Sequence, residues 1–120
     1  MTLARSCRDE LRGRPEGRAE TRRHNLLRCA FVDLADGDVD RATVAATGVV
    51  ADADLVGEPY VHLLAVELLA ASVARDDPQR ARKLLTAADE ERTAIGAAAW
   101  PFEPYRQFAA HTLDVPRPNR

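Results

Sequence analysis

The chain is 120 residues long, 46% of them hydrophobic and only 5% aromatic, with a formal net charge of -2 at pH 7. This length is that of a single domain, and a core of small and aliphatic side chains with few aromatics favours helices over sheets. No stretch approaches the ~18 continuous apolar residues that span a bilayer, and no apolar segment of a signal peptide is present, so we expect a cytoplasmic protein without a membrane contact.

The first 19 residues are predicted to form a flexible arginine-rich arm, because GRPEG at residues 13–17 interrupts any helix and few apolar residues surround it. Several arginines in such an arm can neutralise nucleic-acid phosphates, so a nucleic-acid-associated accessory protein is one functional alternative. The arm also carries acidic residues, lacks interleaved aromatics and leads into an acidic body, all of which count against that alternative. Cys7 and Cys29 are too few for a disulfide framework and fit a reducing compartment.

Residues 20–113 are predicted to form a helical-repeat domain that begins with a helix from about Glu20. Its apolar residues recur at the spacing of one helical face, namely Leu26, Leu27, Ala30, Phe31, Leu34 and Ala35. The pair Asp36-Gly37 predicts the end of this helix, since glycine is favoured just past a helix C-terminus. Asp38 can then cap the next helix by accepting a hydrogen bond from an otherwise unpaired backbone N–H.

The alternating aspartates Asp36, Asp38 and Asp40 also suggest a calcium loop. Such a loop needs glycine at its sixth position and glutamate at its twelfth, and counting from Asp36 puts Arg41 and Thr47 there. We therefore interpret LADGDVDRA, residues 34–42, as the corner between two helices.

A second unit follows the predicted loop ADADLVGEP at residues 51–59, with a long apolar helix that ends near Arg75. In its corner ARDDPQRA, residues 74–81, Asp77 takes the position of Asp38 at an offset of 39 residues, and a proline occupies the first helical position. The same offset aligns apolar residues with apolar residues: Leu27 with Val66, Ala30 with Leu69, Leu34 with Val73, Ala35 with Ala74, Ala42 with Ala81 and Ala46 with Leu85. This internal repeat predicts stacked antiparallel helix pairs.

A fifth, closing helix is predicted after Gly96, and the proline-rich residues 114–120 are predicted to form a disordered tail. The aromatic side chains of this region are expected to cover the apolar side of the helix from about Pro78 to Ile95. These aromatics are Trp100, Phe102, Tyr105 and Phe108.

Side chains that could support chemistry do not converge in this sequence. His24, Cys29, His62 and His111 lack the paired spacing of a zinc site, and no serine lies on a glycine-rich elbow. No glycine-rich phosphate loop is present either. We therefore predict no catalytic residue, no cofactor and no metal, and hence no enzyme.

The repeat carries a family resemblance. RRHNLLRCAFVDLADGDVDRA resembles a tetratricopeptide-type helix pair, and ARDDPQRARKLLTAADEERTAIG is similar to a segment of the helical C-terminal regions of bacterial LuxR-like and AfsR-like ATPase transcriptional regulators. The resemblance covers roughly residues 20–113 and implies an all-α fold of about five helices, with antiparallel pairs stacked into a short right-handed superhelix. Those regulators also carry a nucleotide-binding and a DNA-binding domain, for which this sequence has no room.

The function that follows is a helical-repeat module for protein–protein interaction in bacterial transcriptional regulation or signalling, with a protein or peptide partner. The first helix has no preceding pair, so we expect a neighbour there: a second copy, a partner protein or the arm. The candidate partner-binding surface is the polar side of the first helix in each pair. It holds His24 and Arg28 in one repeat and His62 and Glu67 in the other, with Glu67 equivalent to Arg28.

Overall fold

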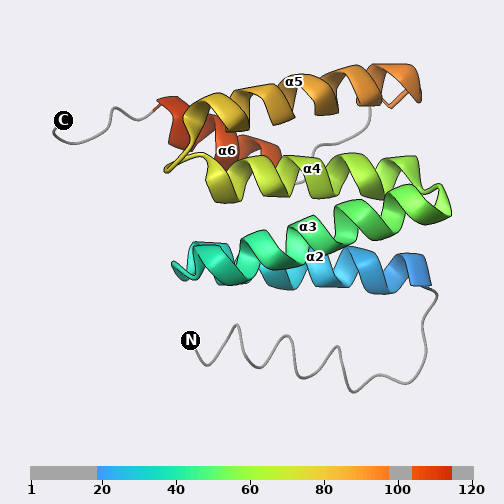
Figure 1. Cartoon of the computed structure of the whole chain (residues 1–120), viewed down its shortest axis with the longest axis horizontal. Helices are drawn as coiled ribbons and strands as arrows, with labels where there is room; N and C mark the ends of the chain where they lie inside the picture. Colours follow the sequence, from blue (N-terminus) through green and yellow to red (C-terminus); the bar gives the residue numbers. More distant parts are fainter. Residues whose placement is uncertain (1–18, 98–103, 115–120) are drawn as a thin grey trace, which may run out of the picture.

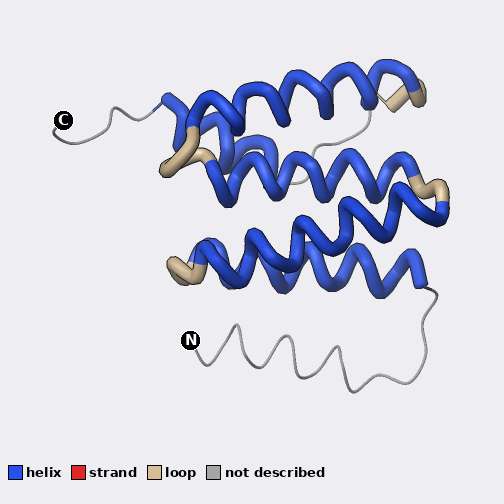
Figure 2. Tube along the Cα trace, in the orientation of Figure 1, coloured by secondary structure: helices blue, strands red, loops and turns tan. Residues whose placement is uncertain are grey.

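A computed structural model describes residues 19–97 and 104–114 of the chain, and all of the regular structure in these ranges is helical (Figures 1 and 2). The predicted arm and tail fall almost entirely outside these residues, as do Trp100 and Phe102. The helices are α2 (Ala19–Ala35), α3 (Val39–Val56), α4 (Pro59–Val73), α5 (Pro78–Ala94) and α6 (Pro104–Asp114). The predicted all-α fold of about five helices is therefore confirmed.

The two predicted corners are built alike. The Asp38 carboxylate accepts a hydrogen bond from the Arg41 backbone N–H at 3.3 Å, and the Asp77 carboxylate accepts one from the Arg80 backbone N–H at 3.2 Å. Each aspartate thus pairs one of the backbone donors that the first turn of α3 or α5 leaves unpaired. The preceding helix α2 ends at Ala35, and Gly37 two residues later has a φ of 93°, a left-handed conformation that glycine adopts without steric cost. The alternating aspartates therefore mark a helix corner.

The predicted loop at residues 51–59 is wrong, because α3 continues to Val56 and only Gly57 and Glu58 connect it to α4. Alanine, leucine and valine keep the helix going, and the two aspartates of this stretch are tolerated on its exposed side. The end of α3 matches the end of α5. Gly57 and Gly96 both have φ of 74°, and the next residue donates its N–H to Ala53 in one case and to Arg92 in the other. The repeat is long because its second helix is long.

Helices α2 and α3 form one antiparallel pair, α4 and α5 form the next, and α3, α4 and α5 lie side by side in chain order (Figure 1). The central helix α4 carries apolar residues around its whole circumference, and every residue from Leu63 to Ser72 is buried. A helix that is apolar on all sides must be covered on all sides. α3, α5, α2 and α6 supply that cover.

The closing helix α6 does not cover α5 as predicted. It packs much more extensively on α4, and its Tyr105 and Phe108 rings contact Phe31 of α2 at centroid distances of 5.4 and 5.6 Å. The apolar surface of α4 explains this position, since α5 is rich in charged residues and offers a narrower apolar face. None of the helices in the described part of the chain combines the length and apolar content required to cross a membrane.

Candidate functional site

The four predicted partner-binding residues are not brought together on one open surface. Arg28 is exposed on α2, and His24 is half-buried with its ring 6.2 Å from the Tyr60 ring. His62 is half-buried on α4, where its Nδ1 lies 2.8 Å from a carboxylate oxygen of Glu91 on α5. Glu67 is fully buried. The expectation that Glu67 belongs to an accessible surface is therefore wrong.

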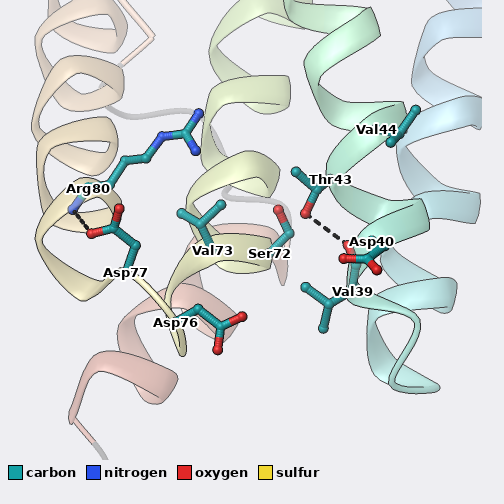
Figure 3. Close-up of a pocket in the computed structure, with 9 residues that line it drawn as sticks. All are labelled: Val39, Asp40, Thr43, Val44, Ser72, Val73, Asp76, Asp77 and Arg80. Atoms are coloured by element: carbon teal, nitrogen blue, oxygen red, sulfur yellow. Dashed lines mark hydrogen bonds between the residues drawn. The ribbon is translucent and has the colours of Figure 1, made fainter.

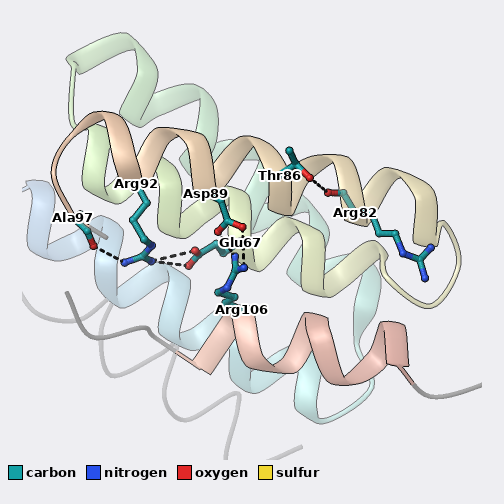
Figure 4. Close-up of polar contacts among 7 residues, drawn as sticks. All are labelled: Glu67, Arg82, Thr86, Asp89, Arg92, Ala97 and Arg106. Atoms are coloured by element: carbon teal, nitrogen blue, oxygen red, sulfur yellow. Dashed lines mark hydrogen bonds and ion pairs between the residues drawn. The ribbon is translucent and has the colours of Figure 1, made fainter. Parts of the chain in front are cut away.

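Glu67 lies between α5 and α6 in the interior of the bundle (Figure 4). The Arg92 side chain, 2% exposed as a residue, donates from Nη2 to both Glu67 carboxylate oxygens at 3.2 and 3.1 Å and from Nη1 to the Ala97 carbonyl at 3.4 Å. Burial raises the pKa of the Glu67 carboxyl, and the hydrogen bond and charge of Arg92 oppose that rise. The first repeat has no counterpart of Arg92, because the equivalent position there is Ala53.

The position of α6 explains why the part of the predicted polar surface around Glu67 is closed. Arg106 on α6 pairs with Asp89 on α5, with Nη2 2.9 Å from a carboxylate oxygen (Figure 4). Tyr105 and Phe108 of the same helix pack on Phe31. This helix therefore lies across the first helices of both pairs, α2 and α4. The sequence pattern predicted that a fifth helix exists, but the predicted packing on α5 was wrong, since α6 packs mainly on α4.

A second ionic cluster fastens the first pair to the second. Arg23 of α2 donates from Nε to Asp52 of α3 at 2.9 Å and from Nη1 to Glu58 at the start of α4 at 2.7 Å. The hydrogen bond to Asp52 and the neighbouring carboxylates raise the pKa of the Arg23 guanidinium further. The 29-residue separation of Arg23 from Asp52 left no local signal for the pairing.

A groove opens between the first turns of α3 and α5 and the last turn of α4 (Figure 3). Its walls combine apolar and acidic side chains from the three helices: Val39, Asp40, Thr43, Val44, Ser72, Val73, Asp76, Asp77 and Arg80. Local bonds already use several of its polar atoms, since Thr43 and Ser72 donate to backbone carbonyls of their own helix and Asp77 caps α5. The groove is thus better suited to binding a partner through apolar and charged contacts than to catalysis.

The apolar surface continues from the groove along the outside of α3. Val44, Gly48, Ala51 and Leu55 follow one another at spacings of four, three and four residues, so they form one line along the helix, which we call the outer stripe. All of them are exposed, Val44 by 73% and Leu55 by 84%, and Val56 beside them is 50% exposed. By comparison, α2 exposes one large apolar side chain, Leu26, by 43%. α3 therefore exposes more large apolar side chains than α2, the first helix, does.

The repeat provides an internal reference for this stripe. At the 39-residue offset, the residues equivalent to Val44, Gly48, Ala51 and Leu55 are Lys83, Ala87, Glu90 and Ala94 of α5, all of them exposed. The outside of α5 is thus polar or small where the outside of α3 is apolar. Equivalent solvent-facing positions of two repeats are expected to have similar polarity. The apolar residues of α3 at these positions therefore point to a contact that α3 makes and α5 does not.

Comparisons with known proteins leave the family open: the chain matches no protein-family model, no curated protein and no solved structure. Among the described residues, no three histidine, cysteine, aspartate or glutamate side chains gather as ligands of a metal ion would. Cys29 is buried in α2.

Proposed function

We propose that this chain is a helical-repeat module for protein–protein interaction, of the tetratricopeptide-like kind that its repeat resembles, which works in bacterial transcriptional regulation or signalling without catalysis of its own. The observation that supports it is the outer stripe. An exposed leucine and valine in line with glycine and alanine, beside a groove with apolar walls, form the type of surface that marks binding sites on soluble proteins.

The position of α6 changes where such a module would bind its partner. Repeat proteins of this type use the surface that the first helices of the pairs line, but here α6 lies across that surface. The outer side of α3 and the neighbouring groove remain accessible. We therefore place the partner on the second helix of the first pair, and not on His24, Arg28, His62 and Glu67.

A photo-crosslinking amino acid at Leu55 tests this function, with the same amino acid at the equivalent Ala94 of α5 as the matched control. We expect irradiation in the source cells to give one discrete adduct from Leu55, the same adduct from Val44, and none from Ala94. The adduct is identified by mass spectrometry, and the identified protein is then purified and titrated against the wild-type chain and the Leu55→Asp variant. Binding to the wild type and its loss in the variant support the proposal. Equal adducts from stripe and control, or none from either stripe position, would refute it.

A further inference from the structure

We infer that the partner on the outer stripe is a second copy of this chain, bound with the two α3 helices antiparallel. This inference rests on the proposed function, because it names the partner of the same surface. It differs from the expected self-association through the first helix, since α3 exposes more of its apolar side chains than α2 does.

The order of residues along the stripe is the first argument. When two α3 helices lie antiparallel with their two-fold axis midway between Gly48 and Ala51, Val44 of one copy lies level with Leu55 of the other, and Gly48 lies level with Ala51. Each large side chain therefore meets a large one at the ends of the contact, while the small residues meet at the centre. Their small size lets the helix backbones approach closely, and the four-three-four spacing is that of a coiled-coil seam. A surface that complements itself in this way is what a two-fold symmetric interface requires.

Gly48 provides a second argument. Glycine in the interior of a helix costs stability relative to alanine, and a Cβ added at Gly48 would meet no other described atom within 4 Å apart from its two chain neighbours and the nearby backbone of its own helix. The fold of a single copy therefore gives no reason for glycine here. A helix of another copy, crossing at this position, does give one.

The charges that flank the stripe favour the antiparallel orientation. A parallel pairing would put the acidic last turns of α3, with Asp52 and Asp54, level with each other in the two copies. The antiparallel pairing puts those turns level with the uncharged residues 45–47. It also opposes the two helix dipoles. Charge therefore selects the orientation, and the apolar contact supplies the attraction.

The size of the contact sets the expected strength. A single pair of crossing helices covers less than the ~800 Å² per partner of a standard interface, so we expect a reversible dimer. Sedimentation of the full chain, from about 5 µM to about 500 µM, should pass from monomer to dimer. Leu55→Asp should weaken the dimer by about tenfold or more, because it places a charge in the apolar contact, whereas Ala94→Asp on α5 should leave the dimer unchanged.

Gly48→Leu separates the dimer from the fold. Gly48 is exposed, its position has room for a Cβ, and leucine is a better helix former than glycine, so helicity and thermal stability at low concentration should be kept or improved. The leucine side chain blocks the closest approach of the two α3 helices, so the dimer should be lost. A variant that stays dimeric would overturn the inference.

Disulfide trapping tests the orientation, in a Cys7→Ser background that keeps the buried Cys29. Antiparallel packing predicts that a mixture of the Val44→Cys and Leu55→Cys chains forms a mixed disulfide under oxidised glutathione, while neither chain alone forms one with itself. The equivalent pair Lys83→Cys and Ala94→Cys on α5 is the control and should form none. Disulfides between like chains, or a monomer at every concentration, would overturn the inference. If a monomer still gives the Leu55 photo-adduct with another protein, the proposed function stands and only the identity of the partner falls.

Discussion

Glu67 is the residue whose environment departs most from what its type suggests. Glutamate is almost never fully buried unless it is paired, and here the pairing comes from Arg92, itself buried on the neighbouring helix. Taking both charges out of water costs more than a typical ion pair returns, so such a pair gives little net stability while the loss of one partner is severe. The pair thus fixes how α4 and α5 pack more than it strengthens the fold.

Removing one partner of this pair should be far more harmful than removing both. We expect Glu67→Ala to lower the free energy of unfolding by about 3–5 kcal/mol, because it leaves the Arg92 charge buried without its carboxylate. The double variant Glu67→Met/Arg92→Leu should lie close to the wild type or above it. Urea unfolding followed by circular dichroism measures both. A double variant as unstable as Glu67→Ala would show that the pair is a net source of stability.

The same pair predicts a pH dependence. Because burial raises the folded-state pKa of Glu67 above its ordinary value of 4.5, the folded state holds this proton more tightly than the unfolded state does. The stability associated with Glu67 is thus fully present below pH 4.5 and is lost as the pH rises through the folded-state pKa. We expect the free energy of unfolding of the wild type, relative to Glu67→Met/Arg92→Leu, to fall as the pH rises through this window. A difference that rises or stays constant would contradict the assignment.

The helix corners belong to the scale of the element, where local sequence decides the outcome. We expect Asp38→Ala and Asp77→Ala each to lower the free energy of unfolding by about 1 kcal/mol, through loss of the cap of α3 or α5. The two corners share no contact, so the double variant should lose the sum. The exposed Asp76, next to the second corner, is the control, and Asp76→Ala should change little. Equal losses at Asp76 and Asp77 would mean that charge, and not capping, is responsible.

Helix α6 is attached through an apolar contact, made by Tyr105, and an ionic contact, made by Arg106. Tyr105 is 2% exposed and packs on Phe31, whereas the side chains of Arg106 and Asp89 are 29% and 48% exposed. We expect Tyr105→Ala to lower the free energy of unfolding by about 3–5 kcal/mol and Arg106→Ala by about 1 kcal/mol or less. Chemical denaturation measures both. If Arg106→Ala cost as much as Tyr105→Ala, the ion pair and not the aromatic packing would hold α6 in place.

The whole molecule combines a closed interior with one open apolar line. Association of folded chains stabilises them by mass action, because unfolded chains do not associate in this way. A dimer through the outer stripe therefore predicts a melting temperature that rises with protein concentration. Leu55→Asp should melt at the same temperature at every concentration, and Ala94→Asp should behave as the wild type does. Differential scanning calorimetry over a wide concentration range provides the measurement. A wild type with no concentration dependence would argue against association on this surface.

Features that depend on a few neighbouring residues were predicted correctly, whereas features that depend on contacts between distant segments were not. The caps at Asp38 and Asp77, the glycine after α2 and the 39-residue register depend on a few neighbouring residues, and all were predictable. The loop at residues 51–59 was mispredicted, since α3 continues through this stretch to Val56. In the structure α3 carries the two aspartates of this stretch on its exposed side, and Arg23 pairs with Asp52 from another helix.

The candidate surface was predicted less well for the same reason. His24, Arg28, His62 and Glu67 were chosen because they share the polar side of the first helices. In the structure Glu67 is interior and the two histidines are half-buried, while Arg28 alone of the four stays exposed. The outer stripe was not predicted, because two of its residues, Ala51 and Leu55, were assigned to the predicted loop. Its exposure was not evident either, since apolar residues at helical spacing also describe a helix face that turns inward.

By itself, the sequence determined the helical class, the ends of most helices and the repeat of a helix pair, because capping, glycine conformation and apolar periodicity act over a few residues. Only the tertiary structure decided that α6 covers α4 and contacts α2, that Glu67 pairs with Arg92 in the interior, and that Val44 and Leu55 remain in solvent. These outcomes depend on which apolar surfaces far apart in the chain bury one another. That competition is settled by packing of the complete bundle, and no local pattern encodes it.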